Sequence, residues 1–291
     1  MSRRRDIPHS KKRIKQKRKI ALWKFFIIFL VIALSLSGFI WGLSRPSLRI
    51  TAIEVTGNNV LDTDEIVSLV RKEISGKYFY LFPKDSIILY PRERIKSDLL
   101  NFYKRILSLS VNAEGLTALS ITINERKPYS LWCGSTLPET RAQENPQCYF
   151  TDETGFIFAE APHFGDNVYI EFYGPLFAEH MATSSLSVEP VGSVYLSALE
   201  FKTIDLFRDL LSRTGLHTTK IASLDAGDVA FIIREGGKIL LNKKQDPMKI
   251  LSDLEAAFRT ELGDPGDPLI RKQIEYIDAR FANKIFFKKK K

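Results

Sequence analysis

The chain has 291 residues, 44% hydrophobic and 26% charged, which is typical of a globular protein and argues against disorder or several membrane spans. The formal net charge is +9, but the positive charge is concentrated at the ends. Residues 1–24 contain eleven lysines and arginines and one acidic residue, and residues 288–291 are all lysine. The sequence between them is mildly acidic, so it lacks the basic folded face on which nucleic-acid binding depends.

An uncharged apolar run at residues 25–43 predicts one membrane-spanning helix. A helix rises about 1.5 Å per residue, so this run matches the hydrocarbon thickness. Trp23 and Trp41 lie near its ends, where aromatic rings favour the headgroup region. A cleaved signal peptide has a shorter apolar region, about 7–15 residues, before a small-residue cleavage site. Because the basic residues precede the run, we expect a single-pass type II protein with a cytoplasmic tail (1–24) and an exported remainder after about Ser44.

Both cysteines, Cys133 and Cys148, lie in the part that is expected to be exported. The residues between them are rich in proline, glycine and polar side chains, so a disulfide that staples this loop is one interpretation in an oxidising compartment. Two unpaired thiols in a loop are the alternative. A metal site is not expected, because no histidine or further cysteine stands at ligand spacing.

Residues 48–128 predict a compact strand–helix–helix–strand–strand unit. Leu48–Thr56 has strand character, and Asp62 with Glu65 forms a capping-box pattern at the start of a helix. A second helix is expected to begin near Pro91. The positions expected to face the core are Ile66, Leu69, Val70 and Ile74 in the first helix, Ile95, Leu99, Phe102 and Ile106 in the second, and Leu107, Leu109, Val111, Leu119, Ile121 and Ile123 in the strands.

Residues 129–288 predict a second, strand-rich unit with two helices, which makes the exported part α+β. The expected strands are Cys148–Thr151, Phe156–Phe158, Val168–Phe172, Ile221–Leu224, Val229–Ile233, Lys238–Leu241, Ile274–Asp278 and Ile285–Phe287. One helix is expected at Leu196–Leu211, with Leu199, Ile204, Phe207 and Leu211 inward, and another begins at Asp246 with Ile250, Leu254 and Phe258 inward. Gly263–Pro268 is expected to be irregular.

Three motifs carry a resemblance to a known family. Ile53–Asn58 (IEVTGN) and Ile121–Pro128 (ITINERKP) resemble the opening and the end of a POTRA domain, and Tyr276–Ile285 (YIDARFANKI) is similar to the end of the FtsQ β domain. In the order tail, span, POTRA domain (48–128) and β domain (129–288), the chain resembles the FtsQ/DivIB cell-division family over residues 20–288. The 134–147 and 174–192 segments look longer than the family needs, and lysines 288–291 replace apolar residues of some members.

The resemblance implies a non-enzymatic divisome scaffold in the cell membrane at the septum. It would bind FtsB/FtsL-like single-span partners, link them to septal peptidoglycan synthesis, and use its final strand as the docking edge. The partner-binding residues carried over are Tyr276, Arg280, Phe281, Asn283, Ile285 and Phe287. Arg280 would be a charged anchor for an acidic partner residue and Phe281 an aromatic anchor. Alternatively, Tyr276 and Ile277 only fill the core and Arg280 pairs internally.

No catalytic motif stands out in the sequence. The four histidines (9, 163, 180 and 217) have no partner at motif spacing, and the nucleotide-binding, hydrolase and metalloprotease signatures are absent. We therefore expect no catalytic residue, no cofactor and no metal. Two other classes remain open, a POTRA-containing export or envelope-assembly factor and a signal-anchored cell-wall enzyme.

Overall fold

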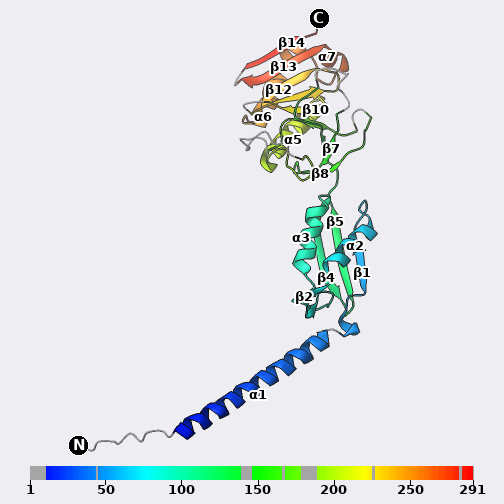
Figure 1. Ribbon diagram of the computed structural model, residues 1–291. Coiled ribbons are helices and arrows are strands. Elements are labelled where there is room, and N and C mark those ends of the chain that lie inside the picture. The colour runs from blue at the N-terminus through cyan, green and yellow to red at the C-terminus, as the bar shows by residue number, and fades with distance from the viewer. Residues whose placement is uncertain are drawn as a thin grey trace, which may run out of the picture. The chain divides into compact units, whose positions relative to one another are not determined.

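The structure is a computed structural model that describes residues 11–43, 45–138, 146–165, 168–177, 189–224, 227–281 and 284–290, with the side chains of the first helix given from residue 18 to 42. The fold is α+β, as predicted, with one apolar helix near the N-terminus and a sheet-rich C-terminal part (Figure 1). The chain divides into two compact units, the first of which includes this helix. The first contains residues up to Phe102 together with Ser108–Asn124, and the second contains Tyr103–Leu107 together with residues from Glu125 onward.

The first helix, α1, runs from Lys11 to Leu43. Its stretch from Arg18 to Gly42 is long and apolar enough to cross a membrane, and none of it is buried against the rest of the protein. The helix therefore begins well before the predicted span at residues 25–43 and continues through the basic residues that precede it.

The first unit contains a three-stranded sheet in the order β1-β5-β4. β1 pairs in parallel with β5, and β4 connects to β5 through a short turn, which only antiparallel neighbours allow. Its elements are β1 (Ala52–Thr56), α2 (Thr63–Glu73), β2 (Lys77–Tyr78), β3 (Phe82–Pro83), α3 (Arg92–Phe102), β4 (Ile106–Glu114) and β5 (Ala118–Glu125). Gly57 has a φ of 81°, and a Cβ there would lie 2.1 Å from the carbonyl oxygen of Ile123, so glycine is required after β1.

The core of these elements follows the predicted apolar positions, with four exceptions. Leu69 is only half-buried. The buried apolar side chains are Ile66, Val70, Ile74, Ile87, Ile95, Leu99, Ile106, Leu109, Val111, Leu119, Ile121 and Ile123. Phe102 is 69% exposed because α3 ends there, and Ile106 is buried as the first residue of β4, not as part of the helix. Leu107 is also exposed, because burial in β4 skips from Ile106 to Leu109.

The second unit is built on a nine-stranded sheet in the order β14-β13-β12-β11-β10-β9-β6-β7-β8. Its strands are β6 (Ser130–Trp132), β7 (Tyr149–Thr151), β8 (Ile157–Glu160), β9 (Glu171–Tyr173), β10 (Thr218–Ser223), β11 (Asp228–Ile233), β12 (Lys238–Asn242), β13 (Ile274–Phe281) and β14 (Lys284–Lys289). The pairs β6/β9, β9/β10 and β12/β13 are parallel, and the other neighbours are antiparallel.

The helices of this unit are α5 (Ala198–Arg213), α6 (Pro247–Ala257), continued by a π-helical turn (Phe258–Leu262), and α7 (Pro268–Gln273). Ile204, Phe207, Ile250 and Leu254 from α5 and α6 join the main core cluster with alternate residues of the strands. Leu199 is 76% exposed, in contrast to its predicted inward position, because the stripe of α5 starts at Phe201. The helix α7 was not predicted. Its N-cap, Asp267, and its first residue, Pro268, are the last two residues of the segment that was expected to be irregular, although proline is common at the first position of a helix.

A disulfide joins Cys133, just after β6, to Cys148, just before β7. The two strands are antiparallel neighbours, with Trp132 paired to Tyr149. The covalent link therefore closes the connection between β6 and β7 at the point where their pairing begins.

Candidate partner-docking edge

The strand β14 is the outermost strand at one end of the nine-stranded sheet (Figure 1). Within the described residues its backbone pairs with β13 alone, from Ile274 opposite Lys289 to Phe281 opposite Lys284. An outermost strand presents unpaired N–H and C=O groups, to which another extended chain can add. β13 itself is enclosed, since it lies between β12 and β14.

The direction of the unpaired groups follows from one hydrogen bond beyond the end of β14. The N–H of Lys290 donates to the carbonyl of Gln273 at 2.7 Å, so it points toward the β13 side. Backbone direction alternates along a strand, and both irregularities in this pairing place the extra residue in β13. The outward N–H and C=O groups are therefore those of Ile285, Phe287 and Lys289, which we call the docking edge.

The side chains of β14 alternate between the core and solvent. Ile285 and Phe287 are half-buried and pack against the main core cluster, which fixes the strand on the sheet. Phe286 points to the other face, where it forms an edge-to-face pair with Phe281, with ring centroids 5.7 Å apart. These two rings are 52% and 53% exposed, so they form an apolar surface beside the docking edge.

A small cavity of about 200 Å³ lies at the same end of the sheet. Ala279, Phe281 and Ile285 line it on the strand side, and Ile250 lines it from α6. Its polar rim comes from Gln245, Asp246, Lys249 and Asp253. An apolar side chain of a segment added to β14 would find a mostly apolar recess with a polar rim here, a combination common in binding sites.

Positive charge dominates the sequence of β14, which contains lysines at positions 284, 288 and 289. Lys288 contacts Glu275 on β13 at 2.8 Å, and this hydrogen bond raises the pKa of the Lys288 amine. Lys289 and Lys290 donate to the backbone carbonyls of Glu261 and Glu235, each at 3.4 Å, and within the described part of the chain they form no ion pair. The edge is thus suited to a partner segment that contains acidic residues.

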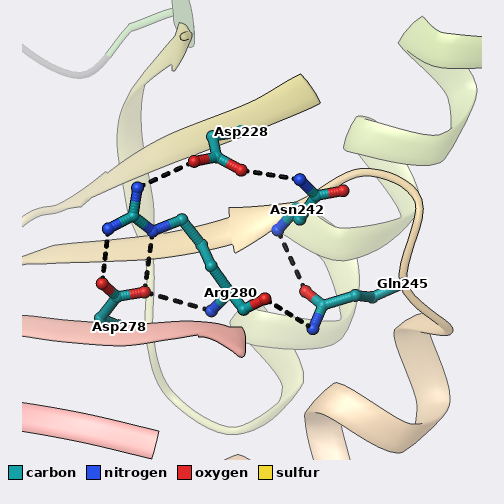
Figure 2. A network of polar contacts seen from close by, with 5 residues as sticks. All are labelled: Asp228, Asn242, Gln245, Asp278 and Arg280. Carbon is teal, nitrogen blue, oxygen red and sulfur yellow. Dashed lines mark hydrogen bonds and ion pairs between the residues drawn. The ribbon is translucent and has the colours of Figure 1, made fainter. Parts of the chain in front are cut away.

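Arg280 is held by two carboxylates of its own unit (Figure 2). Its Nη1 contacts Asp228 on β11 at 2.8 Å, and its Nε and Nη2 contact Asp278 at 2.9 and 2.6 Å. The hydrogen bond from Arg280 holds the pKa of the Asp278 carboxyl below its usual range. The hydrogen bonds to Asp278 and, to a smaller extent, to Asp228 raise the pKa of the Arg280 guanidinium. The guanidinium of Arg280 and the carboxylates of Asp228 and Asp278 thus neutralise one another, and the ion pair with Asp228 spans from β13 across β12 to β11.

Two amide side chains extend this network to the start of α6 (Figure 2). Asn242 donates from Nδ2 to Asp228 at 2.7 Å, and its backbone N–H donates to Oε1 of Gln245 at 3.2 Å. Gln245 in turn donates from Nε2 to the backbone carbonyl of Arg280 at 3.2 Å. The network therefore fixes both the side chain and the backbone of Arg280 near the end of β13.

No protein-family model matches the chain, and no curated protein matches it significantly.

The predicted partner-binding residues fall into four groups. Phe281, Ile285 and Phe287 lie on or beside the docking edge, whereas Tyr276 is half-buried within the sheet, opposite Lys238 and Lys288. Arg280 pairs internally, which was the alternative interpretation, and Ile277 is fully buried as that alternative required. Asn283 lies outside the described residues.

Sequence reasoning did not find the network residues Asp228, Asn242 and Gln245, or the exposed ring of Phe286. The exposure of Phe286 could have been predicted, because side chains alternate along a strand and Phe286 stands between Ile285 and Phe287, which face inward. Nothing in the sequence connects Asp228 with Arg280, because they come together only through strand pairing. Among the described residues, no group of three or more His, Cys, Asp or Glu is placed to hold a metal ion.

Proposed function

We propose that this chain is a membrane-anchored, non-enzymatic scaffold of the FtsQ/DivIB type for bacterial cell division. It would bind FtsB/FtsL-like single-span proteins through the docking edge and link them to septal peptidoglycan synthesis. The single observation that carries the proposal is the unpaired outer edge of β14, with the exposed rings of Phe281 and Phe286 beside it.

The proposed topology rests on α1. Its apolar stretch is long enough for one span, and the excess of basic residues before it favours a cytoplasmic N-terminus. Both sheet-containing units would then be exported. The disulfide between Cys133 and Cys148 agrees with an oxidising compartment.

The first unit supports the POTRA part of the proposal through its element order. It has a strand, two helices and two further strands, and its first strand pairs in parallel with its last. We propose that this unit is a POTRA domain that supplies further protein contacts close to the membrane. An export or assembly factor of the same class remains the competing function.

Binding by strand addition divides affinity and specificity between two kinds of contact. Backbone hydrogen bonds to the docking edge supply affinity for any extended segment. The recess beside Ile285, the rings of Phe281 and Phe286, and the lysines of β14 would select a segment with an apolar and an acidic residue at suitable spacing. No bond is made or broken in this process.

The test is capture of the partner in living cells. A photo-crosslinking amino acid at Phe286 of a full-length fluorescent fusion should trap a small single-span membrane protein, and the fusion should form mid-cell rings. The same amino acid at Leu199, which is 76% exposed on α5, serves as the matched control and should trap little. Uniform envelope fluorescence, or equal trapping from both positions, would refute the proposal and favour the export class.

A further inference from the structure

The most exposed aromatic residues outside α1 lie at the tip of a short hairpin in the first unit. β2 and β3 pair antiparallel, with Tyr78 opposite Phe82, and the turn between them consists of Phe79, Tyr80 and Leu81. These three side chains are 85%, 94% and 50% exposed. Exposed apolar side chains that are contiguous in this way mark interaction sites more often than scattered ones do.

The backbone of this turn is unfavourable for the residues that occupy it. Phe79 and Tyr80 have φ angles of 49° and 62°, in the left-handed region that glycine or asparagine adopts most easily. Neither ring is buried in return, so packing within the unit does not explain why aromatic residues stand there. An external contact for the rings would explain it.

The base of the hairpin is fixed to the chain that directly follows α1. The N–H of Ile87 donates to the carbonyl of Leu48 at 2.9 Å, and the N–H of Ile50 donates to the carbonyl of Asp85 at 2.8 Å. Arg49 and Asp85 form an ion pair between these two bonds. The segment after the hairpin is thus attached to residues 48–50.

This attachment limits how far the hairpin can be from a membrane that α1 crosses. Leu48 is the fifth residue after Leu43, and five extended residues span at most about 18 Å. The turn lies about four residues from the attached segment, which corresponds to roughly 13 Å along an extended strand. The interfacial layer adds about 5–7 Å on each side of the hydrocarbon, so the turn can reach it.

The composition of the hairpin is that of a segment at a membrane interface. The sequence from Lys77 to Lys84 places six apolar or aromatic residues between two lysines and contains no acidic residue. Lys84 extends over the ring of Tyr78, with Nζ 5.5 Å from the ring centroid. Tyrosine rings favour the headgroup level, phenylalanine and leucine side chains bury at the boundary with the acyl chains, and flanking lysines attract anionic lipid.

We propose that the β2–β3 hairpin inserts the side chains of Phe79, Tyr80 and Leu81 into the outer leaflet interface of the membrane that α1 spans. This inference rests on the membrane anchoring in the proposed function and adds a second, lipid-binding contact to it. The contact would restrict the orientation of the first unit at the membrane surface.

The experiment measures the depth of position 80 in full-length protein reconstituted into vesicles. The two native cysteines are joined, so Tyr80→Cys provides a single thiol for an environment-sensitive fluorophore. We expect blue-shifted emission and strong quenching by brominated phosphatidylcholine, with a further increase when phosphatidylglycerol is included. Val60→Cys is the matched control, since Val60 is 66% exposed and follows the opposite end of β1 from residues 48–50. Its label should remain unquenched.

A second variant separates lipid contact from folding. With the label at Leu81→Cys, the double substitution Phe79→Asn and Tyr80→Asn should reduce quenching at least about threefold without lowering the unfolding temperature, because asparagine tolerates this backbone. Flotation of the vesicles reports anchoring separately. The hairpin proposal would be overturned if the protein floats with the vesicles but the label at position 80 is no more quenched than the label at position 60. That result would leave the proposed membrane anchor intact. A hairpin that binds protein instead would give that same result.

Discussion

A proline at the centre of the docking edge should separate backbone recognition from side-chain recognition. The substitution Phe287→Pro removes an N–H that points away from β13, so the bonds between β13 and β14 stay intact. Phe287→Val is the matched control, because it removes the same ring but keeps the donor. Both variants lose part of the packing of a half-buried ring, at a cost of about 1 kcal/mol in folding free energy.

The expected size of the effect follows from the hydrogen bonds that an added strand can form. Ile285, Phe287 and Lys289 each offer one outward N–H and one outward C=O. Each such bond contributes about 1 kcal/mol net, which gives an upper value of about 6 kcal/mol for the whole edge. Proline removes one donor, and its ring hinders the neighbouring contact, so about 2 kcal/mol of binding free energy should be lost. This loss is equivalent to roughly 30-fold in Kd.

The measurement is a titration of full-length protein in nanodiscs with the single-span protein that the crosslinker at Phe286 captures. We expect near-normal affinity for Phe287→Val and roughly 30-fold weaker binding for Phe287→Pro, with similar unfolding temperatures for the two. Equal affinities of the two variants would refute strand addition at β14. In that case, the partner would recognise side chains or another surface.

Three further predictions concern the second unit. Arg280→Gln should lower the free energy of unfolding by about 2 kcal/mol in denaturant titrations, because it leaves two carboxylates facing each other. The pKa of Asp278 is lower in the folded protein than its unfolded value of about 3.9, so Asp278 contributes stability above that pH and this contribution is lost as the pH falls through the folded pKa. The free energy of unfolding of Arg280→Gln should therefore depend less on pH in the acid range than that of the wild type. Replacing both Cys133 and Cys148 by alanine should cost about 3 kcal/mol, as should a reductant acting on the wild type, and no change with either would contradict the disulfide. Burial and a hydrogen bond to an aspartate raise the pKa of Tyr129 to about 12, so Tyr129 should contribute a fall in stability between pH 10 and 12. Tyr129→Phe should reduce that fall in alkaline unfolding measurements, and the buried Tyr195, whose pKa is also raised, should account for the rest.

The sequence predicted those elements in which local chemistry and hydrophobic period agree. Asp62 caps α2 and Asp246 caps α6 as their positions indicated, and the apolar stripes behind them are buried. Apart from that of the half-buried Leu69, the wrong burial predictions fall at the ends of elements, because the apolar periodicity of the sequence continues past the residues that form the element. Phe102 and Leu199 continue a helical stripe in the sequence, but each stands at a helix terminus with no opposing surface to cover it.

The candidate site was predictable only in part. The final two strands were predicted at Ile274–Asp278 and Ile285–Phe287, and the structure has strands at both places. The contact of Arg280 with Asp228 was not predictable, because Asp228 lies 52 positions away and reaches it only through the pairing of β11 with β12 and of β12 with β13. A charged residue in a motif is thus equally compatible with an external anchor and an internal brace until the strand order is known.

The brace around Arg280 has a consequence for the energetics of association. The amide of Gln245 and the two aspartates hold the end of β13, on which β14 is paired. If a partner adds to β14 as proposed, the sheet should therefore lose little conformational freedom. The entropy of ordering then falls almost wholly on the incoming segment. A segment that continues from a preformed helix should therefore bind far more tightly than the same residues offered as a free peptide.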